Sequence, residues 1–386
     1  MDTKKDLPAL TVKFLSSIDQ VSAADWNQVC GVSNPFIQHA FLSALEQTGC
    51  VNRQTGWQPH HAVTYQNDQI CAVMPLYIKH HSNGEYVFDW GWAEAYHRHR
   101  INYYPKLLTA IPFTPATGPR ICVSTGVDRE QIIDLLIKEI KQLAETKGYS
   151  SWHLLFPHAA EAKLLADTSL SQRTGCQYHW FNQDYSSFEQ FLATFTSRKR
   201  KMINRERRQV YEQGIQLTRL TGRQIGEKHI RMFYRFYQAT YYKHAQQGYL
   251  NLDFFIKIVQ TMTDKLLLVI CYRDDEPVAG ALSFIGSDTL YGRYWGCIEE
   301  YNSLHFEACY YQGIDFCIEH GLKRFDPGAQ GEHKIVRGFE PVQTCSFHYI
   351  AHPVFKQAID DFLVQERRGL SEYTEHAKTL LPFRKN

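Results

Sequence analysis

The stretch between Leu290 and Phe339 collects side chains that could carry out acid–base chemistry on a bound ligand. Imidazole, carboxylate and phenol groups can exchange protons, and Lys and Arg can hold phosphates or carboxylates. The candidates are Arg293, Tyr294, Glu307, Gln330, Glu332, His333, Lys334 and Arg337. Three neighbouring glycines (Gly328, Gly331, Gly338) would let the backbone approach a ligand closely. We therefore expect a ligand site here, the alternative being a surface loop held by ion pairs.

The secondary structure predicted around these residues would bring them to one place. Aromatic and β-branched residues bounded by glycine predict a strand over 290–297, and a helix follows Asn302-Ser303 and ends at Gly321. A second strand is expected over 323–326. In such a strand–helix–strand unit the helix start and both strand ends lie at one edge of the sheet, where ligands of open α/β folds usually bind.

A second group of candidates is the basic run over 197–208. Residues 187–213 predict two helical pieces, and the second is the basic helix over 197–213. At helical spacing, one face of it would carry Arg198, Lys201, Arg205 and Arg208. Such a row suits phosphates or an anionic surface. The alternative is the solvated face of a linker helix.

Composition limits the class of protein. The chain has 386 residues and a formal net charge of +2, so we expect two domains and only local phosphate recognition, not a generally basic nucleic-acid binder. Ten cysteines occur without a CxxC pair, which indicates a reduced, cytoplasmic protein. Because no apolar run reaches membrane-spanning length and the N-terminus lacks an apolar segment, we expect a soluble, unexported protein.

The two halves of the chain show similar order. Residues 60–66 with 70–79, and 266–272 with 277–285, each predict a hairpin, and a shift of 207 superposes their turns. Gly148, which ends a predicted helix over 129–147, meets Gly321 at a shift of 173, so the first half carries about 34 additional residues near 80–113. A rival shift of 205 matches Trp90-Gly91 with Trp295-Gly296 but breaks the order of elements. We expect mixed α/β sheets in two domains, 1–182 and 183–386.

Metal and cysteine chemistry are weaker alternatives. Histidines cluster at His60-His61, His80-His81 and His97-x-His99. Neighbouring residues of a strand point to opposite faces, and no HExxH or Cys/His spacing is present, so no metal is expected. Cys297 and Cys309 lie near the candidate site, but no paired histidine identifies either of them as a nucleophile.

Several characteristic strings occur in both halves of the chain. They are His81-Ser-Asn-Gly-Glu-Tyr-Val-Phe-Asp-Trp90, Tyr103-Tyr-Pro-Lys-Leu107, Pro112-Phe-Thr-Pro115, Leu290-Tyr-Gly-Arg-Tyr-Trp-Gly296, Leu304-His-Phe-Glu307, Cys309-Tyr-Tyr-Gln-Gly-Ile314 and Gly328-Ala-Gln-Gly-Glu-His-Lys334. Through them the chain resembles, over nearly its full length, bacterial peptidoglycan biosynthesis or recognition proteins of the GNAT and Fem-like acyltransferase superfamily. The resemblance implies two tandem GNAT-like (Fem-type) modules. It also implies a transferase that moves an acyl or aminoacyl group to an amine, in cell-wall precursor metabolism.

The resemblance leaves two donors open. Acyl-CoA enzymes of the GNAT type hold the pyrophosphate on a Gly-rich loop before the helix. Here that position reads Glu299-Glu-Tyr-Asn-Ser-Leu-His305, whose two carboxylates would repel a pyrophosphate. The basic helix followed by Gly214-Ile215 resembles the equivalent element of Fem-type aminoacyltransferases. Aminoacyl-tRNA is therefore preferred over acyl-CoA as donor.

Acyl transfer to an amine assigns expected roles to the candidates. Glu332 or His333 would take the amine proton, and Tyr294 would protonate the leaving oxygen or sulfur. Arg293, Lys334 and Arg337 would hold phosphates or carboxylates, with Gln330 beside them. Glu307 either binds substrate or only stabilises the positive end of its helix.

Residues of the additional segment are candidates for an acceptor pocket. These are Glu85, Asp89 and Trp92, for which packing and turn roles are the alternative. Two other functions remain open: a non-catalytic recognition protein for cell-wall precursors or RNA, and an acyl-CoA-dependent N-acetyltransferase. The expected partners are a small-molecule or cell-wall precursor acceptor and tRNA.

Overall fold

The computed structural model describes residues 10–243, 245–329 and 331–384, which fall into two compact units. The first unit comprises Met1–Thr174 with Cys345–Arg367, and the second comprises Gly175–Thr344 with Arg368–Asn386. Three elements contribute residues to both units: β9 (Ser171–Phe181), β15 (Glu340–Ile350) and α12 (Pro353–Thr379). The sequence predicts a domain boundary after residue 182. It does not predict that residues 345–367 belong to the first unit.

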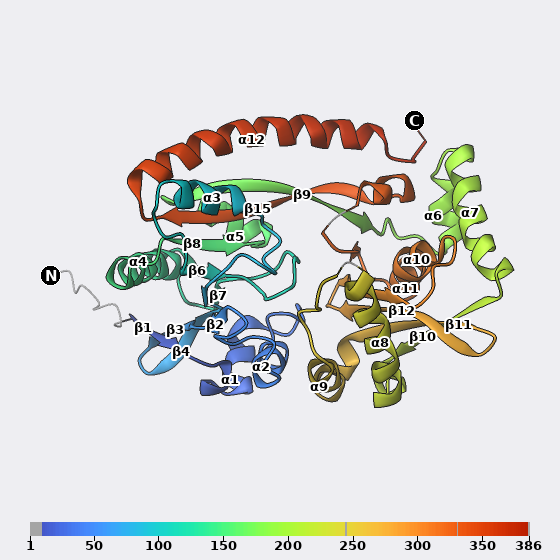
Figure 1. The fold of residues 1–386 in the computed structure, drawn as a ribbon, viewed down its shortest axis with the longest axis horizontal. Coiled ribbons are helices and arrows are strands. Elements are labelled where there is room, and N and C mark those ends of the chain that lie inside the picture. The colour runs from blue at the N-terminus through green and yellow to red at the C-terminus, as the bar shows by residue number, and fades with distance from the viewer. Residues whose placement is uncertain (1–9, 244, 330, 385–386) are drawn as a thin grey trace. The chain divides into compact units, whose positions relative to one another are not determined.

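The first unit contains two sheets and five shorter helices (Figure 1). One sheet has the order β1-β3-β4-β7, and the other contributes the order β15-β8-β6-β5-β2. The strands are β1 (Leu10–Leu15), β2 (Trp57–Pro59), β3 (His61–Gln66), β4 (Gln69–Met74), β5 (Tyr77–Lys79), β6 (Lys106–Thr109), β7 (Cys122–Val123) and β8 (Ser151–Leu155). The helices are α1 (Ala23–Cys30), α2 (His39–Gln47), α3 (Trp90–Arg98), α4 (Arg129–Lys147) and α5 (Ala159–Ala166).

The helix α4 shows how sequence pattern produces this unit's core. Asp128 accepts hydrogen bonds from the backbone N–H groups of Glu130 and Gln131, which caps the helix start. Gly148 ends the helix with φ of 71°, in the left-handed region that favours glycine. Between them, isoleucine and leucine recur at helical spacing and pack against β8, where Trp152 is buried. The predicted helix over 129–147 is confirmed.

The second unit is built on one sheet with the order β10-β11-β12-β13-β14-β9. Its strands besides β9 are β10 (Ile215–Thr221), β11 (Leu266–Arg273), β12 (Glu276–Ile285), β13 (Thr289–Cys297) and β14 (Arg324–Asp326). Its helices are α6 (Phe188–Ala193), α7 (Ser197–Glu212), α8 (Glu227–Lys243), α9 (Leu252–Met262), α10 (Leu304–Phe306), the π-helical segment η4 (Glu307–Tyr311) and α11 (Gln312–Glu319). A short 3-10 helix, η5 (Glu332–Arg337), follows β14.

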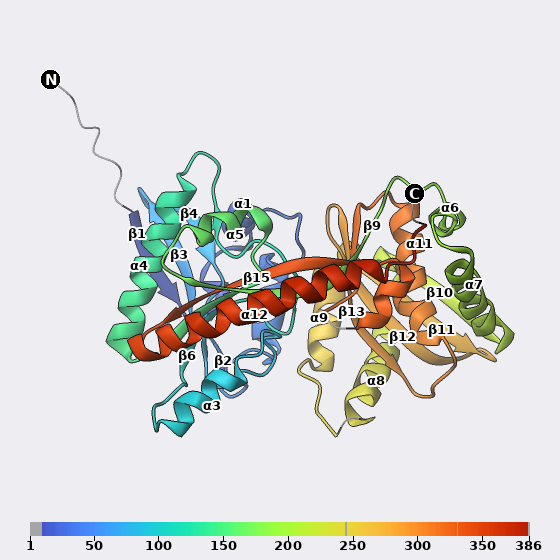
Figure 2. The same cartoon turned by 90° about the horizontal axis from the view of Figure 1, so that it is seen from above.

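Helices cover both faces of this sheet (Figure 2). α8 and α9 lie on one face, where Gly296 of β13 is so close to α8 that a Cβ would be 2.0 Å from the carbonyl oxygen of Phe236. α10, η4 and α11 form one continuous helix on the other face. β13 and β14 are parallel and joined through this helix, as predicted.

Most strongly patterned elements of the sequence are found where expected. Both hairpins are confirmed, as β3 with β4 and as β11 with β12. The sequence pattern did not identify the long strands β9 and β15 or the helix α9. Among the described residues, every helix is either too short or too polar to cross a bilayer.

Candidate active site

A break in strand pairing opens a cavity in the second unit. Leu282 of β12 pairs with Tyr294 of β13, but Ser283 pairs with Gly292, so Arg293 is the additional residue of a β-bulge. On its other side β13 pairs with β14 only from Thr289 to Tyr291. Beyond that point β13 continues without this neighbour, and the chain after β14 turns away through 327–329.

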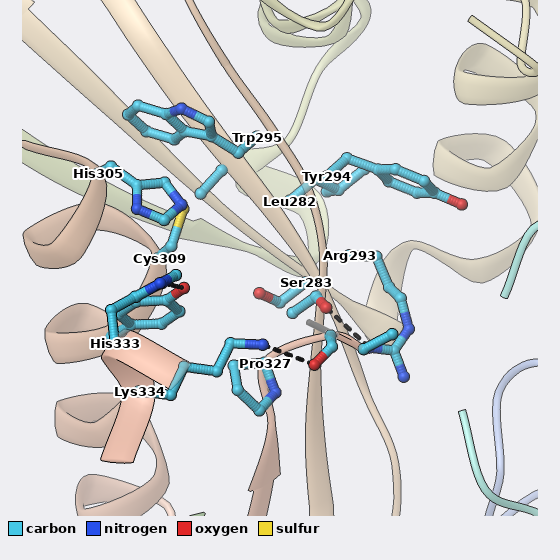
Figure 3. Close-up of a pocket in the computed structure, with 15 residues that line it drawn as sticks. Leu282, Ser283, Arg293, Tyr294, Trp295, His305, Cys309, Pro327, His333 and Lys334 are labelled. Carbon is cyan, nitrogen blue, oxygen red and sulfur yellow. Dashed lines mark hydrogen bonds between the residues drawn. The ribbon is translucent and has the colours of Figure 1, made fainter. Parts of the chain in front are cut away.

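The cavity in this gap has a volume of about 270 Å³ (Figure 3). One wall is formed by 281–283 of β12 with 292–295 of β13, and another by 327–329. His305, Cys309 and Tyr310 come from the continuous helix, and His333 and Lys334 come from η5. Four predicted site residues therefore lie on one cavity: Arg293, Tyr294, His333 and Lys334.

Lys334 brings a buried ammonium group to this cavity. Its side chain is almost entirely buried, and Nζ donates a hydrogen bond to the carbonyl oxygen of Gly328 at 2.6 Å. Burial lowers the pKa of Lys334 to about 8, partly opposed by Asp326. The amine is thus protonated at neutral pH but releases its proton more readily than an exposed lysine.

Asp326 and Arg293 form a buried ion pair next to the cavity. The Arg293 guanidinium donates to both carboxylate oxygens of Asp326, at 2.7 and 3.2 Å, and Gly328 N–H donates to the same carboxylate at 2.9 Å. Burial raises the pKa of Asp326, but Arg293 outweighs it and holds that pKa well below its usual range. Burial also lowers the pKa of the adjacent His179 to about 4. Arg293 is therefore already paired with a protein carboxylate.

His333 and Tyr310 form a hydrogen-bonded pair on the opposite wall. The Tyr310 hydroxyl and His333 Nε2 are 2.8 Å apart. Burial, followed by the charges of Lys334 and Arg337, lowers the pKa of His333, whereas burial raises that of Tyr310. The imidazole is consequently neutral at pH 7 and can accept the tyrosine proton at Nε2.

Tyr294 borders the cavity but is directed differently. Its ring packs against Tyr237, Phe255 and Phe284, with centroids 5.5 to 6.4 Å away. In Figure 3 its hydroxyl points away from His333, on the other side of the view. The next residue, Trp295, faces His305 instead. Tyr294 and Trp295 thus point to opposite faces of the sheet, as successive residues of a strand do.

Three further candidates lie outside the cavity lining of the described chain. Glu332 is exposed and accepts a hydrogen bond from Tyr373 at 2.8 Å. Glu307 is fully buried, and Arg207 donates to it at 3.0 and 3.1 Å. Arg337 is buried and donates hydrogen bonds to the Glu206 carboxylate and to the His333 carbonyl. Gln330 lies outside the described residues.

Glu85, Asp89 and Trp92 belong to the first unit, not to this cavity. Lys106 Nζ donates to Glu85 at 2.8 Å and also to Asp89, and all three side chains are buried. Trp92 packs against the imidazole of His348, which lies 2.5 Å from His153 between their Nδ1 atoms. Both carboxylates therefore already have a lysine partner.

The basic row on α7 is exposed as predicted. Arg198, Lys201 and Arg205 are on the solvent side, and Arg208 beside them pairs with the exposed Glu212 at 3.3 Å. The other side of the helix buries Ile203 and Val210 against the second unit. Four cationic side chains thus form a row on one helix face.

Some residues of this site were missed by sequence reasoning. Tyr310 lies within a predicted helix whose aromatic residues read as core, and nothing in the sequence distinguishes it from Tyr311 beside it. Asp326 ends a predicted strand, a position that could have marked it. Among the described residues, no group of three or more His, Cys, Asp or Glu side chains is arranged to hold a metal ion.

The chain is similar in sequence to one protein family and in fold to several solved structures. The family model FemAB-like, described as peptidoglycan biosynthesis/recognition, matches residues 17–385. No curated protein sequence matches the chain. The solved structure of FemX is 12% identical with a TM-score of 0.52, covering 91% of this chain and 100% of FemX.

Two other solved structures give similar values. The C-terminal domain of a protein described as a lysylphosphatidylglycerol synthetase from Agrobacterium fabrum is 8% identical, with a TM-score of 0.52, covering 89% of this chain and 97% of that one. A tandem GNAT protein from the clavulanic acid biosynthesis pathway has 8% identity and a TM-score of 0.47, covering 89% and 99%. The predicted mixed α/β fold of Fem type is confirmed by the family match and the similarity to FemX.

Proposed function

Because the chain belongs to the FemAB-like family of peptidoglycan biosynthesis/recognition proteins, we propose that it transfers an aminoacyl group from aminoacyl-tRNA to an amine of a cell-wall precursor. The observation that carries this proposal is the cavity of the second unit. It combines a buried ammonium group, Lys334, with the neutral pair of Tyr310 and His333. These are an electrostatic stabiliser and a proton acceptor within one small enclosure.

The proposed reaction forms an amide bond and breaks an ester bond. As the acceptor amine attacks the ester carbonyl, Tyr310 takes the amine proton and passes its own to His333 Nε2. The Lys334 ammonium stabilises the oxyanion and then protonates the departing ribose oxygen. His333 is exposed and returns its proton to solvent. Lys334 then regains a proton from water that enters the cavity after the product leaves. Tyr294 serves as a wall of the cavity and not as the proton donor.

The basic row on α7 supports a nucleic-acid donor. It is a run of exposed guanidinium and ammonium groups on the same unit as the cavity. The loop before α10 instead exposes Glu299 and Glu300, and Glu300 pairs with Lys243 at 3.2 Å. Carboxylates at that helix start oppose a pyrophosphate, so acyl-CoA is the weaker choice of donor.

The test is transfer of a radiolabelled aminoacyl group to amine-bearing peptidoglycan precursors. With charged tRNA as donor, Lys334→Met should lower kcat by about 100- to 1000-fold, as loss of an oxyanion-stabilising group does. The rate should fall as pH rises through about 8, where Lys334 loses its proton. Transfer from acetyl-CoA but not from tRNA would point to an N-acetyltransferase. Binding of precursor without transfer would point to a recognition protein. Either result would overturn the proposal.

The basic row predicts salt-dependent binding of tRNA. Arg198→Ala with Arg205→Ala should weaken binding by about 10- to 100-fold and reduce the slope of log K against log salt by about 2. Arg223→Ala with Lys228→Ala removes two exposed charges from another part of the same unit and serves as the control. Equal losses from both pairs in filter binding would mean that α7 has no particular role.

A further inference from the structure

The two sides of α7 have different partners. Outward, the helix exposes the basic row. Inward, Arg207 pairs with Glu307 at 3.0 Å and with Asp315 at 2.7 Å, which fastens α7 to η4 and α11. Its neighbour Glu206, directly after Arg205, also faces inward and contacts η5, the segment that carries His333 and Lys334.

The contact between Glu206 and η5 is made through Arg337. The guanidinium donates to Glu206 Oε1 at 2.7 Å and to Oε2 at 3.2 Å, and Tyr311 donates its hydroxyl to the same carboxylate. Another N–H of Arg337 donates to the backbone carbonyl of His333 at 2.6 Å. The guanidinium also lies 3.4 Å from the centre of the Phe306 ring. One arginine thus bridges α7, the continuous helix and η5.

The segment η5 depends on such a bridge. It is a 3-10 helix, whose backbone hydrogen bonds have poorer geometry than those of an α-helix. It is flanked by Gly331 and Gly338, with φ of 116° and 87°, and no side-chain cap holds its start. Side-chain contacts therefore contribute much of what fixes His333 and Lys334 in place.

We infer that Glu206 is a positioning residue: by holding Arg337 it fixes the His333 carbonyl, and with it the His333 imidazole and the Lys334 amine in the cavity. This inference rests on the proposed function, since positioning matters only if these groups react. Because Glu206 adjoins Arg205, the same contact connects the basic row with the cavity. Arg337, expected from sequence to bind substrate, is on this view a bridge within the protein.

The charges around His333 provide a direct readout. From η5, Lys334 and Arg337 lower the pKa of the imidazole. From the continuous helix, His305, Cys309 and Tyr310 line the same cavity. The Glu206 carboxylate offsets the charge of Arg337. Removing that carboxylate should lower the pKa of His333 further, and removing the arginine should raise it.

The experiment is an NMR titration of histidine-labelled protein, with the His333 signal assigned by its loss in His333→Asn. Glu206→Gln should lower the pKa of His333 by about 0.5, whereas Glu206→Asp, which keeps the charge, should stay within about 0.2 of the wild type. In an Arg337→Met background, Glu206→Gln should still lower the pKa of His333 through the lost charge, but it should not lower kcat further, because the bridge is already absent. Glu212→Gln, which removes a surface carboxylate from the same helix, is the matched control.

Kinetics separate this inference from the proposed function. Glu206→Gln should lower kcat for transfer about tenfold and leave the KM for tRNA unchanged, whereas Arg198→Ala with Arg205→Ala should raise that KM. An unchanged His333 pKa in Glu206→Gln, or an equal shift in Glu212→Gln, would overturn the inference even if transfer occurs. A shifted pKa in a protein without transfer activity would overturn only the proposed function. If Glu206→Gln does not fold, Arg337→Met decides: no rise in the pKa of His333 contradicts the bridge.

Discussion

Lys334 is a residue at which stability and chemistry oppose each other. An ammonium group that is nearly fully buried costs free energy. Among the described residues one acceptor, the Gly328 carbonyl, binds it, and Arg293 lies nearby with the same sign of charge. The pKa of Lys334 is lowered because the folded protein disfavours the charged form of this side chain. A residue that destabilises its own unit while facing a cavity is typical of a functional site.

Lys334→Met is therefore expected to raise stability while strongly lowering the rate of transfer. The folded pKa of about 8 lies below the usual 10.5, so the protonated lysine carries its full cost at pH 7. The variant should gain about 1 to 2 kcal/mol in urea unfolding at pH 7, allowing for the lost hydrogen bond. As pH rises from 8 to 10.5 the wild type should recover this difference. A variant less stable than wild type at pH 7 would contradict this account.

The buried imidazole pair of the first unit makes a pH prediction of the same sign in a lower pH range. Burial, then the charge of Arg173, lowers the pKa of His348 to about 3. Its stability contribution is therefore complete above pH 6.5 and is lost as pH falls towards 3. His348→Leu should flatten the dependence of unfolding free energy on pH between 6.5 and 4.5 by about 1.4 kcal/mol per pH unit. The exposed His80→Leu, measured in the same way, should leave the slope unchanged.

At the scale of elements, ion pairs hold the additional segment near 80–113 against its sheet. Lys79 of β5 and Lys106 of β6 are register partners on neighbouring strands and are both buried. Glu85 and Asp89 of the segment lie against them, and Lys79 packs over the Trp57 ring at 3.7 Å. Burial lowers the pKa of Lys79 to about 6 and raises that of Glu85 to about 7.

Breaking this network from one side should be costly. Lys106→Met removes the ammonium group that donates to both buried carboxylates and should lower the free energy of unfolding by about 3 to 5 kcal/mol. Adding Glu85→Gln and Asp89→Asn removes the stranded charges and should restore most of the loss. Lys138→Met on the exposed side of α4 should change the unfolding free energy little. Failure of the triple variant to recover would mean that Lys106 acts through packing alone.

Sequence pattern located elements whose stabilising contacts are local. α4 and both hairpins follow from periodicity and turn residues, and the basic row follows from helical spacing. β9 and β15 were missed because their pairing partners lie far away in the chain. Within the site, the bulge at Arg293 was not predicted, since strand alternation in sequence does not reveal an inserted residue. Tyr310 was missed because it lies among other aromatic residues of one predicted helix, and nothing in the sequence distinguishes it from Tyr311.

At the scale of the whole molecule, the first unit is assembled from two separate pieces of chain. Ser346 to Ile350 of β15 pair with β8, and Phe347 lies in the core beside Trp152. Phe355, Ile359 and Leu363 of α12 pack with Tyr96 and Tyr103. Residues 1–182, the domain suggested by sequence, lack all of these contacts.

A fragment of residues 1–182 is therefore expected to remain unfolded. Gly175 and Thr344 lie side by side, since a Cβ at Gly175 would be 2.8 Å from Thr344 Oγ1. Joining residues 1–174 to 345–367 through an Asn-Gly turn should thus give a folded first unit. Circular dichroism and urea unfolding would compare the two, with a cooperative transition expected only for the joined chain. Cooperative unfolding of 1–182 alone would contradict the division described here.

The passage of α12 from one unit to the other also affects biosynthesis. During translation the early residues of the first unit leave the ribosome long before Cys345–Arg367 exist, and most of the second unit is made before Arg368–Asn386. At about 5 to 20 residues per second, the nascent polypeptide waits many seconds with apolar surface uncovered. Newly made chains should consequently engage holdase chaperones during synthesis.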